Sequence, residues 1–207
     1  MTSATVAALF VETNGCYTGL PDVDAWDVKR DARTYSGPHA VVAHPPCERW
    51  GRYWSGGPSV GERKILGDDG GCFESALASV RNYGGVLEHP EASHAFKRFG
   101  LGAPSKRGGW HVSELGRRSW VCCVEQGHYG HPARKATWLY VVGEMPAELI
   151  WGPSTGQRLD EGFHSSAERD AARAAGIRPI KRLSSAQNIA TPVAFRDALL
   201  SIARSNQ

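Results

Sequence analysis

The sequence predicts a single α/β domain with a mostly parallel β-sheet and an antiparallel hairpin at its edge. Two observations support this prediction. Short apolar runs alternate with a helix-like segment in the first half of the chain, which favours parallel strands joined by crossovers. Two β-rich runs later in the chain flank a turn-prone segment, which favours an antiparallel pair. The length of 207 residues suits one domain with a sizeable core.

Three apolar runs are the expected parallel strands: residues 6–12, 40–44 and 85–89. Between the last two, Phe73, Leu77 and Val80 follow each other at helical spacing and would share one face of a helix. The glycines that follow at positions 84 and 85 would end this helix.

The second half of the chain predicts the hairpin and two further helices. Residues 120–126 and 135–143 are the strands of the hairpin. Residues 165–176 form a helix with a charged, solvated surface, and residues 191–205 form the last helix. We expect Thr191 to cap that last helix, with Pro192 at its first position.

The cysteines and the charge narrow the class of protein. Five cysteines, an odd number without a CxxC pair, argue against a disulfide framework and against a thiolate zinc site. No secretory leader and no apolar run of about 20 residues is visible, so we expect a cytoplasmic protein, bacterial or phage-encoded, without a membrane partner. A net charge of +3 permits a nucleic-acid partner. We expect no metal, although His44, Cys47, His89 and His131 leave a zinc site as an alternative.

Cys47 is the leading candidate for a nucleophile. It follows a predicted strand and the pair Pro45-Pro46, which stiffens the loop and ends the sheet ladder. Glu88 lies at the end of the next predicted strand, and ligands of parallel α/β sheets bind beyond the carboxyl ends of the strands. The alternatives are structural: Cys47 as a small buried residue, and Glu88 as a helix cap or an ion-pair partner.

Several segments in order resemble the DNA cytosine-5 methyltransferases, and especially their shortened phage-type relatives. "VVAHPPCERWG" resembles the Pro-Pro-Cys strand and loop, and "GVLEHPEASH" resembles the following Glu-Asn segment. "YGHPARKATWLYVVG" and "QNIATPVAFRDALL" are similar to the later strand and to the segment that opens the last helix, and "LFVETNGCY" is a weak match to the first glycine-rich loop. The resemblance implies a Rossmann-like, methyltransferase-type domain.

The resemblance also implies a mechanism. Cys47 would add to carbon 6 of cytosine and so activate carbon 5. Glu88 would hold the ring nitrogen and the exocyclic amine, and Arg134 or Lys135 would support the covalent complex and the phosphate. The substrate would be DNA with a flipped base, next to a basic and aromatic loop. The substrate-binding residues would be His44, Pro45, Pro46, Arg49, Trp50, Arg52, His89 and Lys135, with Tyr53 and Trp54 alongside; packing is the alternative role for the aromatic residues.

The cofactor of the family is S-adenosylmethionine, and here the sequence departs from the pattern. Ala8 replaces the opening aspartate, and Glu12 and Asn14 replace glycines, so that only Gly15 remains. Asp22 or Asp24 could serve as well as Asp27 to bind a ribose. The expected cofactor residues are Phe10, Asn14, Gly15, Asp27 and Asn188.

Two alternatives remain beside a DNA cytosine-5 modifying enzyme. One is a related pyrimidine-modifying enzyme that uses another donor or acts on nucleotides. The other is a non-enzymatic DNA-binding protein or inactive paralogue of phage origin. The chain between Gly143 and Asn188 is too short for the usual target-recognition region, so we expect sequence specificity to be weak, supplied by a protein partner, or built on the short loops.

Overall fold

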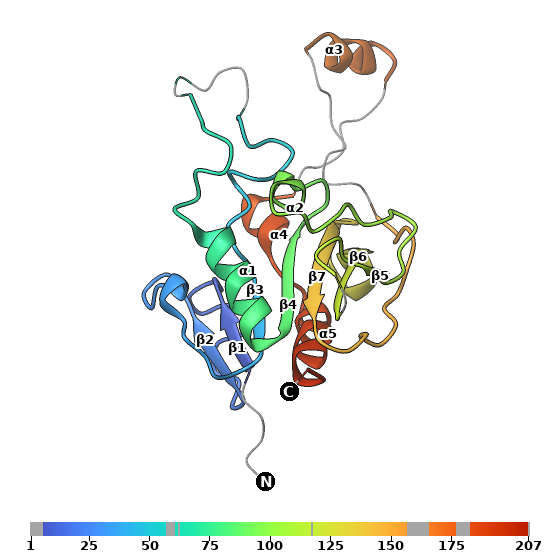
Figure 1. Cartoon of the computed structure of the whole chain (residues 1–207). Helices are drawn as coiled ribbons and strands as arrows, with labels where there is room; N and C mark the ends of the chain where they lie inside the picture. Colours follow the sequence, from blue (N-terminus) through green and yellow to red (C-terminus); the bar gives the residue numbers. More distant parts are fainter. Residues whose placement is uncertain are drawn as a thin grey trace.

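A computed structural model describes residues 6–56, 61, 63–116, 118–156, 166–176 and 183–206. Its seven strands form one mixed sheet in the order β2-β1-β3-β4-β7-β6-β5 (Figure 1). The strands are β1 (Val6–Leu9), β2 (Val23–Trp26), β3 (Val41–Ala43), β4 (Gly85–Pro90), β5 (His111–Val112), β6 (Ser119–Glu125) and β7 (Ala136–Val142). The first four are parallel, whereas β7 is antiparallel to both β4 and β6, and β5 is antiparallel to β6. The predicted α/β class and the hairpin are therefore confirmed.

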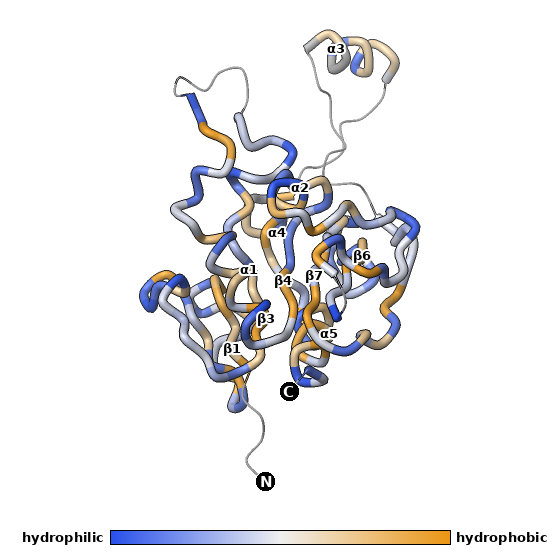
Figure 2. The backbone as a smooth tube through the Cα atoms, in the orientation of Figure 1, coloured by the Kyte–Doolittle hydropathy of each residue, from blue (hydrophilic) through white to orange (hydrophobic). Residues whose placement is uncertain are grey.

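Helices cover both faces of the sheet. They are α1 (Cys72–Tyr83), α2 (His94–Arg98), α3 (Ser166–Ala174), α4 (Ser185–Ile189) and α5 (Val193–Arg204), with the short 3-10 helices η1 (Ala32–Thr34) and η2 (Gln126–Tyr129). Figure 1 shows α1 and α5 on opposite sides of the central strands. Figure 2 shows hydrophobic residues concentrated along these strands and along α5.

The core has two halves, one on each face. Phe73 of α1 belongs to one buried cluster and Phe195 of α5 to the other. Successive strand residues point to opposite faces, and Cys122 and Cys123 follow this rule: each lies in a different cluster. The two adjacent thiols are both buried, and they cannot ligate one ion together.

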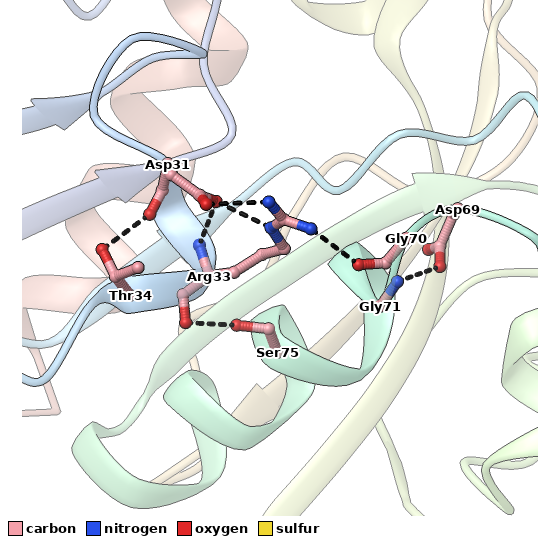
Figure 3. A network of polar contacts seen from close by, with 7 residues as sticks. All are labelled: Asp31, Arg33, Thr34, Asp69, Gly70, Gly71 and Ser75. Atoms are coloured by element: carbon pink, nitrogen blue, oxygen red, sulfur yellow. Dashed lines mark hydrogen bonds and ion pairs between the residues drawn. The ribbon is translucent and has the colours of Figure 1, made fainter.

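The start of α1 is tied to the neighbouring loops by a polar network (Figure 3). Asp69 accepts hydrogen bonds from the backbone N–H groups of Gly71 and Phe73, at 3.0 and 2.8 Å, and so satisfies donors at the helix start. Arg33 of η1 donates to the Gly70 carbonyl at 3.1 Å and pairs with Asp31. These contacts fix α1 against the segment that follows β2.

The structure differs from the predictions in several places. Strand β2 was missed because its sequence, VDAW, is half-exposed and lacks a long apolar run. The connections from β1 to β2 and from β2 to β3 contain no α-helix, so α1 is the α-helical crossover among the four parallel strands. Strand β1 ends at Leu9, because Phe10 adopts a left-handed backbone with φ of 57°.

Two of the predicted helices also differ in their bounds. Pro192, not Thr191, is the N-cap of α5. The helix predicted at 165–176 is α3, and position 165 lies outside the described residues.

Within the described residues, no helix is long and apolar enough to cross a membrane.

Candidate active site

The candidate site lies at the carboxyl edge of the parallel strands. The loops after β1, β2, β3 and β4 all leave the sheet at this edge, and β7 begins there because it runs antiparallel to β4. Arg134 and Lys135 precede β7, so the topology brings them to the same edge as Cys47. Sequence positions almost ninety residues apart therefore meet for a topological reason, as expected for parallel α/β sheets.

The loop after β3 holds Cys47 in a fixed turn. The Cys47 carbonyl accepts hydrogen bonds from the N–H groups of Trp50 and Gly51, at 3.0 and 2.8 Å. The Trp50 carbonyl in turn accepts one from the His94 N–H of α2 at 2.8 Å. Pro45 is buried, while Pro46 and Cys47 are exposed. The thiol therefore stands on a stiff, hydrogen-bonded loop.

Cys47 lies on the wall of a cavity of about 510 Å³. Arg134, Lys135 and Asn188 line the same cavity, together with Arg52, Tyr53 and Trp54. The remaining lining residues are Glu48, Gly51, Pro90, Glu91, Lys106, Cys123, Glu125, Ala136 and Gly152. Its volume is within the range of small-molecule sites, and its wall combines cations, carboxylates, aromatic rings and a thiol.

Glu88 lies beside this cavity in a network of hydrogen bonds and does not line the cavity itself. Its Oε2 lies 3.1 Å from His44 Nδ1, and its Oε1 accepts from the Gln126 amide at 3.4 Å. The Glu88 side chain is 13% exposed and that of His44 14%. Burial raises the pKa of the Glu88 carboxyl. The hydrogen bond and charge of His44 lower it, and the positive charge of Lys135 lowers it further. The lowering effects are larger in sum, so the pKa of Glu88 lies below its ordinary value.

The electrostatic surroundings of Cys47 do not favour the thiolate in the free protein. Burial raises the pKa of the Cys47 thiol, and the negative charge of Glu88 raises it further; the cation of Lys135 works in the opposite direction. Burial lowers the pKa of Lys135, whose ammonium group donates to the carbonyls of Ile189 and Ala190 at 3.0 and 2.8 Å. Lys135 thus connects the thiol to the end of α4.

Helix α4 positions Asn188 on the cavity wall. Ser184 and Gln187 form a capping box at its start. The Gln187 carbonyl lies 3.0 Å from His131 Nε2, and Lys135 holds the last carbonyls of the helix. Arg134 donates to the Gly156 carbonyl at 3.2 Å.

The mouth of the cavity carries a cluster of charges. The Glu91 carboxylate, 11% exposed, pairs with Arg52 at 2.7 Å and with Lys106 at 2.9 Å. Tyr53 beside them is 64% exposed. The Glu91 carboxylate thus pairs with two cations beside an exposed aromatic ring.

Two of the expected substrate residues lie in the core. Trp50 is buried, donates from Nε1 to Asp69 at 2.8 Å and packs on Phe73, so it is not available to stack on a base. His89 is fully buried with its ring edge-on to Phe73 at 5.1 Å between centroids, because the alternation along β4 turns it to the α1 face. Arg49 is partly buried, and its Nη1 has no hydrogen bond.

The expected cofactor residues divide into two groups. Asn188 lines the cavity, whereas Phe10, Asn14, Gly15 and Asp27 lie in the loops after β1 and β2. Asn14 adopts a left-handed backbone with φ of 59°, a conformation that asparagine tolerates well. Gly15 serves a tight turn, since a Cβ there would lie 3.0 Å from Glu12.

Among the three candidate aspartates, Asp27 lies at the carboxyl edge of the sheet. Asp22 pairs with Arg204, and Asp24 pairs with Arg30. Asp27 directly follows β2 at the carboxyl edge and accepts a hydrogen bond from Thr13 at 2.7 Å. The loops after β1 and β2 are thereby joined at the place where the resemblance implies the cofactor.

Sequence reasoning missed Tyr17, Gln126 and Lys106. Tyr17 is buried and its hydroxyl lies 2.9 Å from His44 Nε2, a contact across 27 positions that no local pattern reveals. Gln126 opens η2 directly after β6, and a polar residue after an apolar strand was a usable signal. Lys106 stood in a basic, glycine-rich loop that resembled many surface loops.

In the part of the chain that the structure describes, no three His, Cys, Asp or Glu side chains are placed to hold a metal ion. His131, part of the zinc alternative, instead contacts the backbone of Ala133 and Gln187 with its two ring nitrogens. No protein-family model matches the sequence, and no curated protein is significantly similar to it.

Proposed function

We propose that the protein is a DNA cytosine-5 modifying enzyme in which the Cys47 thiolate adds to carbon 6 of a flipped pyrimidine. The observation that carries this proposal is the position of Cys47 on the wall of a nucleotide-sized cavity with Arg134 and Lys135, next to Glu88. The sheet, in which four parallel strands are followed by three strands paired antiparallel, supports the methyltransferase-type, Rossmann-like domain that the resemblance implies.

The chemistry assigns one task to each group. The thiolate of Cys47 forms a bond to carbon 6, the π electrons move toward the ring nitrogen, and that nitrogen takes a proton through Glu88. Carbon 5 then accepts an electrophile, loses its hydrogen to a base, and expulsion of the thiolate restores the double bond. Lys135 stabilises the thiolate by its charge, and Arg134 binds a phosphate.

DNA is the proposed substrate because of the cavity mouth. Arg52 and Lys106 supply cations there, and Tyr53 and Trp54 supply rings on which bases can stack. A base must leave the duplex to reach a thiol on the wall of a cavity. The chain offers little room for a separate recognition region, so a protein partner or these short loops would direct the enzyme to its target.

S-adenosylmethionine is the proposed donor. Asp27 would hold its ribose, with Phe10, Asn14 and Gly15 beside it and Asn188 at the methionine end. When bound, it would supply the electrophilic methyl group.

A donor-free assay tests the proposal. Addition of a thiolate to carbon 6 allows the hydrogen on carbon 5 to exchange with water, so the protein should release tritium from DNA that carries [5-³H]deoxycytidine without any cofactor. Cys47→Ser is the matched control, because it keeps the size of the side chain and removes the nucleophile. Release from the free nucleotide and not from DNA would assign the enzyme to nucleotides. No release from either substrate would refute thiol addition and leave a DNA-binding role.

A further inference from the structure

Two loops and strand β4 are linked at the carboxyl edge by a series of side-chain hydrogen bonds. The Tyr17 hydroxyl, after β1, lies 2.9 Å from His44 Nε2, and His44 Nδ1, after β3, lies 3.1 Å from Glu88 Oε2 on β4. The rings of Tyr17 and His44 lie 5.4 Å apart between centroids. Both nitrogens of His44 are therefore engaged, and its ring has one orientation.

This series of hydrogen bonds directs two donors at the Glu88 carboxylate. When His44 is neutral with its hydrogen on Nδ1, the Tyr17 O–H donates to Nε2 and Nδ1–H donates to Glu88. Gln126 donates to the other Glu88 oxygen at 3.4 Å and is itself held by Thr137 at 2.9 Å. Such an arrangement stabilises an ionised carboxylate. Cytosine presents an unprotonated ring nitrogen, however, and needs a proton from this carboxyl group when the thiolate adds.

We propose that His44 supplies this proton through Glu88 and that Tyr17 is the positioning residue that holds His44 for the transfer. The inference rests on the proposed function. In the step, a proton passes from the His44 imidazolium to Glu88, and a proton passes from Glu88 to the ring nitrogen as the sulfur–carbon 6 bond forms. The products are neutral His44 and a neutral adduct, so charge and atoms balance. Expulsion of the thiolate reverses the transfer.

Other titratable groups face this pair. Cys16 lies in the same loop as Tyr17, with Arg196 and Asp197 of α5 nearby. Lys135, which precedes β7, and His89 of β4 act on Glu88, and Cys47 lies on the side of the cavity. Lys135 and Arg196 are the cations among them. Lys135 donates to the Ile189 and Ala190 carbonyls and Arg196 donates to the Cys16 carbonyl, so among the described residues His44 is the titratable group that is hydrogen-bonded to the Glu88 carboxylate.

Chemical rescue tests the role of His44. His44→Ala should lower tritium release from cytosine about 100-fold, as expected for loss of a general acid, and added imidazole should restore a large part of the rate. Among substituted imidazoles, the restored rate should follow their acid strength. Tyr17→Phe should lower the rate about fivefold, the value of one hydrogen bond. The control is His39→Ala, at the opposite end of β3, which should keep the wild-type rate and gain nothing from imidazole.

A second measurement keeps the inference separate from the proposed function. In the wild-type protein, ¹³C NMR should show the Glu88 carboxyl titrating below its ordinary pKa, and in His44→Gln the midpoint should rise, because burial remains while the hydrogen bond is lost. A full exchange rate in His44→Ala, or a loss that imidazole does not restore, would overturn the inference while thiol addition stands. If the wild-type protein releases no tritium, the proposed function fails. In that case an unchanged titration midpoint of the Glu88 carboxyl in His44→Gln would also overturn the coupling between His44 and Glu88.

Discussion

The buried imidazole of His89 should make the protein less stable in acid. The ring is fully buried against Phe73, and neither nitrogen has a hydrogen bond. Burial lowers the pKa of His89 to about 4 from an ordinary 6.5, against the opposing charge of Glu88. The unfolded chain therefore binds a proton on His89 at a higher pH than the folded protein does.

The sign and the size of the effect follow from this difference. Above pH 6.5 the ring is neutral in both states and has no effect. As the pH falls from 6.5 toward 4, the unfolded state gains protons first, so the free energy of unfolding decreases. The loss should be about 1 kcal/mol at pH 5.5 and about 3 kcal/mol at pH 4. Small domains have a total stability of about 5–15 kcal/mol, so this loss is large.

Urea unfolding followed by tryptophan fluorescence between pH 4 and 7 measures the effect. The matched variant is His89→Leu, which keeps an apolar side chain of similar size against Phe73 and cannot titrate. The free energy of unfolding of this variant should depend less on pH by the amounts given above, while the contribution of His131 is common to both proteins and cancels in the difference. Parallel pH curves for the two proteins would refute the assignment of a neutral, buried ring to His89.

Further predictions concern the thiol, the two tryptophans and the cofactor. Cys47→Ser should abolish tritium release and change the free energy of unfolding by less than about 1 kcal/mol, since the side chain is exposed. Iodoacetamide should alkylate Cys47 faster in Glu88→Gln and slower in Lys135→Gln, because the first change lowers the pKa of the thiol and the second raises it; peptide mass spectrometry locates the label. Trp50→Ala should lower the free energy of unfolding in urea by about 3–5 kcal/mol, because Trp50 is buried. Trp54→Ala should leave this free energy nearly unchanged and weaken DNA binding about tenfold, because Trp54 lines the cavity. Equal stability losses in the two variants would contradict the placement of Trp50 in the core and Trp54 on the cavity wall. Calorimetric titration should detect saturable binding of S-adenosylmethionine, and a folded protein that does not bind it would refute this donor.

Local patterns were sufficient for the main elements of the fold. The spacing of Phe73, Leu77 and Val80 predicts α1, and Gly84 ends it as expected, with φ of 74°. Apolar runs predict β1, β3, β4 and the hairpin. The sequence patterns did not predict strand β2, because Asp24 interrupts its apolar residues. This strand is stabilised by pairing with β1 rather than by its own composition.

The same limit applies to individual site residues. Trp50 and Trp54 stand in one aromatic loop and are indistinguishable by sequence, but a hydrogen bond to Asp69 and contacts with Phe73 place Trp50 in the core. His44 directly follows β3, and His89 lies near the end of β4. The first turns to Tyr17 and Glu88, and the second is buried, because each side chain follows the face of the sheet to which its position assigns it.

The sequence by itself determined the α/β class, the stiff loop that presents Cys47 and the position of Glu88 at the end of a strand, since these depend on residues close together in the chain. Only the tertiary structure decided that Lys135 lies near Cys47, that Tyr17 contacts His44 and that His89 is buried. The physical reason is that such contacts depend on strand order and on which face each side chain takes. Both are set by packing of the whole sheet against α1 and α5, and no local stretch of sequence encodes them.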